Sequence, residues 1–361
     1  MFQGIRAAGK VSLVACALAL ASCSPSASEA PEPRTDFSIG WSIYAGWVPW
    51  PYAQQAGIVK KWADKYGLEI NFVQVNDYVE SVNQYTAGKL DGVTVANMDA
   101  LTIPAAGGKD TSAIIVGDYS NGNDGILLKG SNSLSAIKGQ KVYLSEFSVS
   151  HYLLARGLEK LNLPLSSVST VNTSDADIVS AFSTPDVKAA VAWNPQLLVM
   201  KNTAGTNLVF SSADIPGEIL DLLVVDTKTR EANPNLGKAL AGIWYETMAL
   251  MQRQDEEGKA ARAAMAKLAG TTPEMYEAQL TTTRLYYDPK EAVEATSSPE
   301  LVTTMTRVRD FSFSQGLFGQ GATSADAIGM SFPGGKTLGN AQNVTLRFDE
   351  SFMKMAADGK L

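Results

Sequence analysis

From residue 37 onward, the sequence alternates short β-rich runs with helical runs. The first half of this pattern predicts strands over 37–44, 68–75, 92–96 and 112–116, and helices over 52–66, 79–87 and 99–106. Gly67 and Gly88 are typical residues to close the first two helices. Alternation at this spacing favours right-handed parallel crossovers. The sequence therefore predicts an α/β fold built on parallel-rich sheets with helices on both faces.

The alternation stops at a polar joint, residues 118–125, and then starts again. Further strands are predicted over 126–129, 141–144, 168–172, 189–193 and 208–210, and further helices over 151–161 and 176–182. After a strand-like run at 219–225, a helical pattern lasts to the end of the chain. We predict two lobes with a ligand cleft between them. Lobe I comprises residues 37–122 and 224–361, and lobe II comprises residues 123–223.

The N-terminus has the pattern of an export signal. Arg6 and Lys10 precede an apolar run, 11–20, which is too short to span a bilayer but suits a secretory signal. The run ends in Leu-Ala-Ser-Cys, which looks like a bacterial lipobox, although a chance cysteine after an ordinary signal is the alternative. We predict a signal peptide over 1–22, lipidation of Cys23 and a flexible stalk over 23–36. The protein is then an exported lipoprotein anchored on the periplasmic side of the cell envelope.

Composition argues against several classes of function. The formal charge of −7 becomes −9 when the signal peptide leaves with its two cations, and no basic stripe points to nucleic acid. His151 is the single histidine, and no clustered spacing of ligand residues indicates a metal site or a catalytic triad. We therefore expect a monomer that has no cofactor or metal and is not an enzyme.

Aromatic residues crowd the stretch that follows the first predicted strand. Residues 41–52 contain five large aromatics and two prolines, and Trp193 ends a strand in lobe II. Aromatic faces suit a flat or cationic ligand, but each ring could equally be core. We take Trp41, Tyr44, Trp47 and Trp193 as candidate ligand-binding residues.

Polar residues at strand ends are the second set of candidates, and they comprise Asn97, Asp99, Asp124 and Glu146. Several acids have structural alternatives. Asp99 could cap the helix that follows it, and Asp118 and Asp124 could form turns in the joint. Asp77 stands three residues before Glu80 in a capping-box pattern, so it is left out of the site. Because few Lys or Arg residues lie near these strand ends, two acids closing on a ligand would require a cation.

The runs at 41–44, 57–67, 83–88, 97–104 and 120–125 carry a family resemblance. The chain resembles periplasmic substrate-binding proteins of the taurine, sulfonate and nitrate type, and most closely the branch found beside urea carboxylase genes. The resemblance implies a bilobal periplasmic-binding-protein fold, an ABC permease and its ATPase as partners, and urea or guanidinium as ligand. The carboxylates and rings favour guanidinium, whose flat face stacks on aromatics and whose N–H groups pair with acids.

The sequence thus predicts a lipid-anchored binding protein that closes by a hinge motion on a small planar nitrogen compound. Three alternatives stay open. The ligand could be another small solute such as a sulfonate, nitrate or an amine. The chain could be an enzyme on the same scaffold, or a receptor or adhesin that binds no small molecule tightly.

Overall fold

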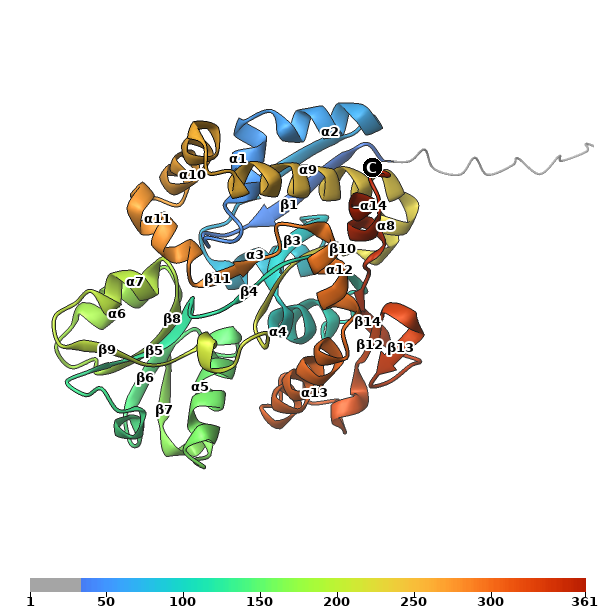
Figure 1. Cartoon of the computed structure of the whole chain (residues 1–361). Coiled ribbons are helices and arrows are strands. Elements are labelled where there is room, and N and C mark those ends of the chain that lie inside the picture. Colours follow the sequence, from blue (N-terminus) through green and yellow to red (C-terminus); the bar gives the residue numbers. More distant parts are fainter. Residues whose placement is uncertain (1–33) are drawn as a thin grey trace, which may run out of the picture. The chain divides into compact units, whose positions relative to one another are not determined.

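The computed structural model describes residues 34–361 (Figure 1), so the predicted signal peptide and Cys23 lie outside the described residues. The larger of its two sheets has the strand order β13-β12-β14-β4-β10-β3-β1-β2, with β11 paired to β4. Its strands are β1 (Asp36–Trp41), β2 (Glu69–Gln74), β3 (Gly92–Ala96), β4 (Thr111–Ser120), β10 (Leu220–Asp226), β11 (Thr283–Leu285), β12 (Gly329–Phe332), β13 (Lys336–Leu338) and β14 (Val344–Phe348).

The smaller sheet has five strands in the order β7-β6-β8-β5-β9. They are β5 (Asp124–Lys129), β6 (Lys141–Leu144), β7 (Ser169–Asn172), β8 (Ala189–Trp193) and β9 (Thr206–Ser211). The chain passes from the first sheet to the second between β4 and β5 and returns between β9 and β10. This two-sheet α/β architecture confirms the predicted fold class.

Both sheets are mixed, whereas parallel-rich sheets were predicted. β1 runs parallel to β2 and β3, but β10 is antiparallel to β3 and β4. In the smaller sheet β5 is antiparallel to both β8 and β9. The crossover rule governs strands joined by a helix within one sheet. The chain enters β5 and β10 directly from the other sheet, so the crossover rule does not require either strand to be parallel to its neighbours.

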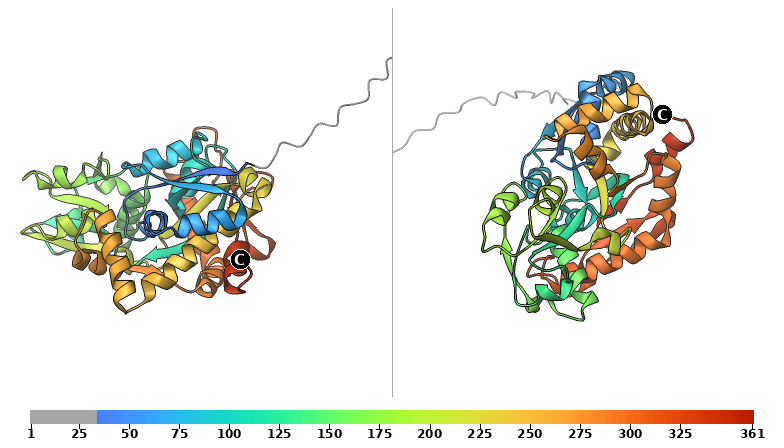
Figure 2. Two further views of the ribbon diagram at one scale, coloured as in Figure 1. Left: turned by 90° about the horizontal axis from the view of Figure 1, so that it is seen from above. Right: turned by 60° about the vertical axis from the view of Figure 1, so that its left-hand side comes forward.

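Helices cover both sheets (Figure 2). Those on the N- and C-terminal parts of the chain are α1 (Pro49–Gln55), α2 (Ile58–Tyr66), α3 (Tyr78–Thr86), α4 (Asn97–Ala100), the π-helical η1 (Leu101–Ala105), α8 (Thr227–Ala232), α9 (Pro234–Gln252), α10 (Glu256–Leu268), α11 (Pro273–Leu280), α12 (Pro289–Ser297), α13 (Pro299–Ser314) and α14 (Ser351–Ala357). The long α9 packs against α1, α2, α10 and α14. Figure 2 shows α2 and α9 side by side.

The smaller sheet has α5 (Val149–Lys160) on one face and α6 (Ile178–Ser183) and α7 (Gln196–Lys201) on the other. The central strand β5 explains this layering. Successive side chains of a strand point to opposite faces. Ile126 and Leu128 join the main core, whereas Leu127 packs in a separate cluster with residues of α6 and α7. The continuous apolar run of β5 is therefore typical of a strand that is buried on both faces.

Two helix predictions are corrected by the structure. The helix predicted over 52–66 is broken into α1 and α2 at Gly57, whose φ of 77° is left-handed and incompatible with a continuing α-helix. The region predicted to be helical to the end of the chain contains β11, β12, β13 and β14. These strands are short, and β14 pairs with β4, far away in sequence. No local periodicity reveals such a pairing.

The predicted lobe boundary at 223/224 falls inside β10. This strand pairs with β3 and β4 from Leu220 to Asp226, so all of it belongs to the nine-stranded sheet. The return between the sheets therefore lies within residues 212–219. The remaining lobe limits stay a prediction.

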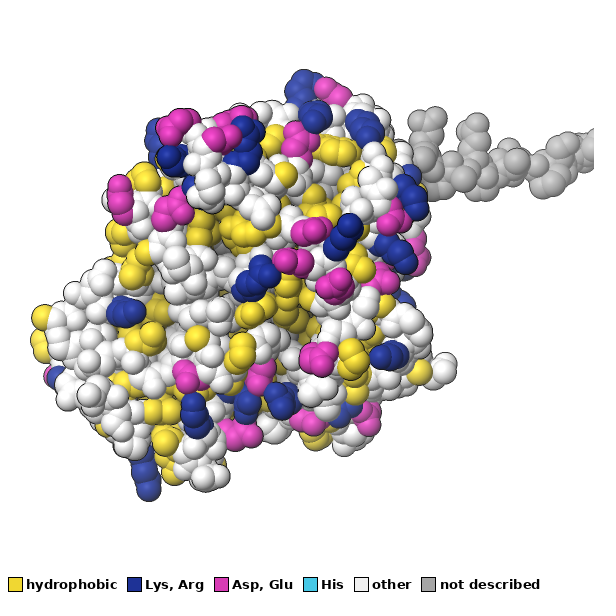
Figure 3. Space-filling view, in the orientation of Figure 1, with side chains coloured by type: hydrophobic (Ala, Val, Ile, Leu, Met, Phe, Trp, Pro, Cys, Tyr) yellow, Lys and Arg dark blue, Asp and Glu magenta, His cyan; other side chains and the backbone are white. Residues whose placement is uncertain are grey.

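The surface of the described residues carries mixed charge. On the face shown in Figure 3, Lys and Arg side chains are interspersed with Asp and Glu and form no continuous stripe. Across residues 34–361, every helix is too short or too polar to serve as a membrane span.

Candidate functional site

The strand registers bring three acids and a tryptophan together where the two sheets connect. Asp221 in β10 lies opposite Asp118 in β4 on one side and Ala96 in β3 on the other. Asp124, the first residue of β5, lies opposite Trp193, the last residue of β8. Directly opposed residues of antiparallel strands share a face, so each pair projects to the same side of its sheet.

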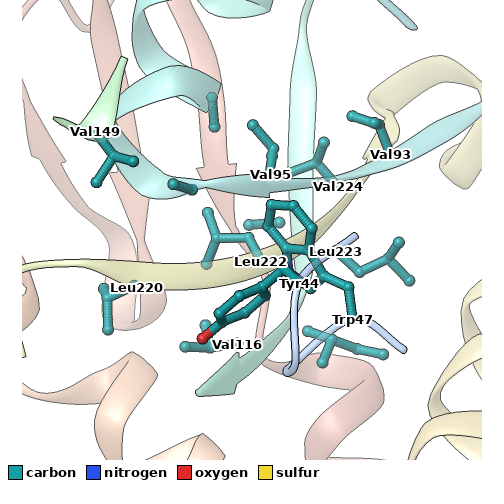
Figure 4. Close-up of a cluster of buried hydrophobic side chains, with 14 of the residues drawn as sticks. Tyr44, Trp47, Val93, Val95, Val116, Val149, Leu220, Leu222, Leu223 and Val224 are labelled. Atoms are coloured by element: carbon teal, nitrogen blue, oxygen red, sulfur yellow. The ribbon is translucent and has the colours of Figure 1, made fainter. Parts of the chain in front are cut away.

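Aromatic rings form a continuous wall beside these acids. The rings of Tyr44 and Trp47, on the loop after β1, meet edge to face at 5.0 Å between centroids. Trp47 lies 5.5 Å from Tyr78 at the start of α3, and Tyr78 meets Trp193 edge to face at 5.6 Å. Figure 4 shows Tyr44 and Trp47 against the branched side chains of β3 and β10. Four rings, from the loop after β1, from α3 and from β8, thus line one space.

Gly46 allows this loop to turn close to the acids. A β-carbon at this position would lie 2.5 Å from Asp118 Oδ2 and 2.5 Å from the ring of Tyr44. Neither neighbour can move freely, because the hydroxyl of Tyr44 donates a 2.8 Å hydrogen bond to Asp118 Oδ1. The absence of a side chain is therefore what lets Tyr44 and Asp118 meet.

The rings and acids enclose a cavity of ≈ 20 Å³. Its lining residues are Tyr44, Trp47, Tyr78, Ala96, Asn123, Asp124, Val149, Trp193, Ile219 and Asp221. This volume holds about one water molecule, so even a ligand of a few heavy atoms requires the walls to move apart, as a hinge motion would allow. Among these described lining residues there are two carboxyl groups and no Lys, Arg or His.

Several buried polar atoms around the cavity lack a partner among the described residues. They are Trp47 Nε1, Asn123 Oδ1, Asp99 Oδ1 and Asp118 Oδ2. Buried polar groups are nearly always hydrogen-bonded, and leaving one unsatisfied costs about 1–3 kcal/mol. Three of the four atoms are acceptors, and two of the four, Trp47 Nε1 and Asn123 Oδ1, belong to residues that line the cavity.

Burial raises the pKa of every carboxyl group in this region. It raises the pKa of Asp99 to about 7, although the hydroxyl of Tyr78 donates a 2.6 Å hydrogen bond to Asp99 Oδ2. It raises the pKa of Asp124 to about 6, against the opposing hydrogen bond from Ser120. Burial also raises the pKa of Asp118 to about 7 and raises that of Asp221, and the neighbouring carboxylate of Asp118 raises the pKa of Asp221 further. Carboxyl groups with pKa values raised in this way, in and beside a cavity wall, make it the candidate functional site.

These raised pKa values predict an unusual pH dependence of stability. The folded protein holds protons that the unfolded chain, with aspartates near pKa ~3.9, releases. The stabilisation is fully present below about pH 4 and is lost as the pH rises through the folded values of about 7 for Asp99 and about 6 for Asp124. We expect the ligand-free protein to melt at a higher temperature at pH 5.5 than at pH 8 by calorimetry.

The Asp118→Asn variant provides the control for this expectation. It removes one of the buried ionisable groups, so the difference in melting temperature between the two pH values should shrink. A melting temperature that rises steadily from pH 5.5 to pH 8 would contradict the assignment of raised pKa values.

Half of the eight predicted site residues line the cavity. Tyr44, Trp47, Asp124 and Trp193 contribute to its wall. Asp99 lies behind Tyr78, to which it is hydrogen-bonded, and does not cap a helix, because it is the third residue of α4.

The structure does not bring the other three predicted residues to the cavity. Trp41 is a buried core residue of β1. The amide of Asn97 donates to Glu218 O at 3.0 Å and accepts from Leu220 N at 3.2 Å, so it holds the returning chain in place. Glu146 accepts a hydrogen bond from Thr170 and lines a separate surface groove.

Sequence reasoning missed several residues of the site. Tyr78 and Asn123 line the cavity, although the sequence did not indicate them as ligand-binding residues. The sequence indicated Asp118 only as a turn residue. Asp221 could have been recognised from the sequence, because it is the one charged residue inside the apolar run 219–225. An ionisable residue in a buried strand costs free energy unless it is paired or functional. Asp77, which was set aside as a cap, does cap α3 by accepting from Glu80 N at 2.8 Å.

Metal chemistry was not predicted for this chain. Within residues 34–361, no group of three or more His, Cys, Asp or Glu side chains is arranged to hold a metal ion.

Comparisons with known proteins agree with this architecture. The model of the NMT1-like family matches residues 31–270. The structure is similar to the alkanesulfonate-binding protein of Xanthomonas axonopodis pv. citri, with a TM-score of 0.64 and 16% identity over 79% of this chain and 95% of that chain. It is also similar to the periplasmic aliphatic sulphonate-binding protein of Escherichia coli, with a TM-score of 0.64 and 19% identity over 79% of this chain and 94% of that chain.

A third similar structure is the periplasmic nitrate-binding protein of Synechocystis PCC 6803. Its TM-score is 0.57 at 12% identity, over 91% of this chain and 99% of that chain. A search of curated proteins finds no match. At these identities the likeness establishes the periplasmic-binding-protein fold, and a shared fold does not determine the ligand.

Proposed function

Because this chain belongs to the NMT1-like family, we propose that it is a solute-binding protein that captures a small planar cation, guanidinium, and delivers it to an ABC permease and its ATPase. The fold supports the general part of this proposal, since the similar structures are named as sulfonate- and nitrate-binding proteins. No chemical step is assigned to the site. The specific part, the identity of the ligand, rests on the cavity.

The observation that carries the proposal is the pairing of aromatic walls with uncompensated acids. Asp124 and Asp221 line a cavity whose described lining residues include no basic side chain. Guanidinium is flat, so it can stack on Tyr or Trp, and its edge carries only N–H donors. Those donors match the unpartnered Asn123 Oδ1 in the cavity wall and Asp118 Oδ2 beside it.

Estimates of the electrostatic free energy favour guanidinium over the other candidate ligands. Two like charges 4 Å apart repel by about 4 kcal/mol at an effective dielectric of 20, so a sulfonate or nitrate would be repelled by each ionised acid. Urea is neutral and would leave a buried carboxylate uncompensated, at a cost of several kcal/mol. A charge-assisted hydrogen bond to guanidinium is about twice as strong as a neutral one.

Titration calorimetry with guanidinium, urea, taurine and nitrate tests the proposal. We expect heat of binding from guanidinium, weaker binding of urea, and none from the two anions. Binding of an anion but not of guanidinium would refute the cationic site. Conversion of guanidinium during the titration would instead support an enzyme on this scaffold.

The Trp193→Leu variant tests the aromatic wall. Loss of the ring removes a cation–π contact worth about 0.5–2 kcal/mol, so guanidinium should bind about 10-fold more weakly. The matched control is Trp62→Leu, which removes a ring on α2 that is not in the cavity wall. Equal affinity of the Trp193 variant and the wild type would show that this ring does not contact the ligand.

The N-terminal pattern supports an anchored location for this binding protein. We propose that Cys23 carries the lipid and that the segment between it and β1, which begins at Asp36 and so shortens the predicted stalk, tethers the binding unit beside its permease. The Cys23→Ser variant should then appear in the soluble periplasmic fraction, whereas the wild type stays with membranes after fractionation. Retention of the variant in the membrane fraction would point to an anchor other than this cysteine.

A further inference from the structure

Two buried carboxyl groups face each other at the floor of the site. Asp118 in β4 and Asp221 in β10 are opposed in register, and their exposed fractions are 0% and 7%. Asp118 Oδ2 has no N–H or O–H donor among the described residues other than a protonated Asp221. A hydrogen bond between two carboxyl groups requires one proton, because two carboxylates have only acceptors.

Within residues 34–361, the groups that act most strongly on this pair include no Lys, Arg or His. The groups that face it are the hydroxyl of Tyr44, the carboxyl of Asp124 and the hydroxyl of Tyr78, from the loop after β1, from β5 and from α3. More distant phenols come from α11 and from the segment after β11, and they belong to Tyr276, Tyr286 and Tyr287. Since like charges in one buried site cannot both ionise cheaply, the empty pair retains a proton near neutral pH.

The pair is also within reach of a ligand. Asp221 lines the cavity together with the four rings, while Asp118 lies beside it and lines an adjoining small space with Trp47 and Trp50. Two lining residues contribute buried polar atoms without partners, Trp47 Nε1 and Asn123 Oδ1, which independently indicate that a polar ligand belongs here.

We propose that the Asp118–Asp221 pair exchanges its shared proton for the bound cation, so that each guanidinium taken up releases one proton to solvent. This inference rests on the proposed function. The exchange balances: one O–H bond of the pair breaks, the proton passes to the buffer, and guanidinium enters with its charge unchanged. The pair then carries two negative charges, which the cation and its N–H donors stabilise.

The exchange makes the pair a determinant of specificity. A neutral solute such as urea supplies no charge to replace the proton, so it binds only to the protonated pair. The affinity for guanidinium should rise about tenfold per pH unit wherever the empty pair is protonated, and should level off where the empty pair has already lost its proton.

Calorimetry in two buffers measures the exchange directly. Guanidinium is titrated at pH 7 into the wild-type protein in phosphate, which has a small ionisation enthalpy, and in Tris, which has a large one. The dependence of the apparent enthalpy on the buffer's ionisation enthalpy should correspond to about one proton released. Guanidinium binding with no buffer dependence would overturn the exchange but leave the proposed function intact. No binding in either buffer would instead refute the proposed function.

Two variants identify the source of the proton. Asp118→Asn removes the like charge that helps to keep Asp221 protonated, so guanidinium binding should release less than one proton at pH 7 and depend less on pH between 6.5 and 8. Asp99→Asn removes the other buried carboxyl with a strongly raised pKa, and it should retain the proton release. The reverse result would assign the proton to Asp99 and overturn the proposal. The two-buffer measurement on the wild type stands even if a variant fails to fold.

Discussion

Replacing Asp124 by Asn is expected to weaken guanidinium binding at least ~30-fold, because truncating one partner of a buried charge pair costs about 2–5 kcal/mol. The substitution keeps the size of the side chain and removes its charge. Asp124 is buried, it lines the cavity opposite Trp193, and its Oδ2 already accepts a 2.5 Å hydrogen bond from Ser120. The affinity would be measured by titration calorimetry at pH 7.5, where this carboxyl is ionised.

The Asp186→Asn variant is the matched control. Asp186 is an exposed aspartate between α6 and β8, and its loss changes the net charge by the same amount. It should bind guanidinium like the wild type. The Asp124 variant should also melt no lower than the wild type at pH 8, because burying a neutral amide avoids the cost of burying a charge. Unchanged affinity in the Asp124 variant would remove this carboxylate from the site.

The largest effect on stability is expected at Glu218, in the segment that returns from the smaller sheet to the larger. Its carboxylate accepts hydrogen bonds from Arg156 Nε and Nη2 at 2.8 and 2.9 Å, from Arg307 Nη1 at 2.8 Å and from the hydroxyl of Tyr152 at 2.6 Å. Arg156 and Tyr152 belong to α5 on the smaller sheet, and Arg307 belongs to α13. One buried acid thus joins elements associated with both sheets.

Glu218→Gln should lower the free energy of unfolding by about 3 kcal/mol, because it leaves the guanidinium groups without their counter-charge. We place the expectation at the lower end of the usual range because the side chain of Arg307 is 53% exposed. The matched control is Glu159→Gln, which removes an exposed partner of the same Arg156 and should cost less than about 1 kcal/mol. Urea denaturation measures the free energy of unfolding of both variants. Similar losses in the two variants would contradict the stabilising role of the buried Glu218 carboxylate.

Glu218 and the cavity aspartates respond to pH in opposite directions. Burial alone would raise the pKa of Glu218, but the hydrogen bonds from Arg156 and Tyr152 hold it below the ordinary value. Its stabilisation is therefore present above the unfolded pKa of about 4.3 and is lost only in acid. The cavity aspartates lose their stabilising protons as the pH rises. The physical difference is that Arg156 and Arg307 lie beside Glu218, whereas the described residues that line the cavity include no Lys, Arg or His.

The sequence by itself determined the layered architecture of this protein. The hydrophobic periodicity of a segment and a glycine that ends a helix are local signals, which need no information from the rest of the chain. Most strands and helices up to β10 were therefore predicted within a few residues. The same local logic identified the cap at Asp77 and the aromatic loop that contains Tyr44 and Trp47. It failed for β11 to β14, whose pairing partners are distant in sequence.

Only the tertiary structure decided which polar residues form the site. Asn97 and Asp221 both lie at or beside strand ends in the sequence, yet Asn97 holds the returning chain while Asp221 lines the cavity. The strand register between β4 and β10 places Asp118 against Asp221, although more than a hundred residues separate them. A register is set by the packing of whole sheets, so the acidic character of the cavity became evident only when distant strands were brought together.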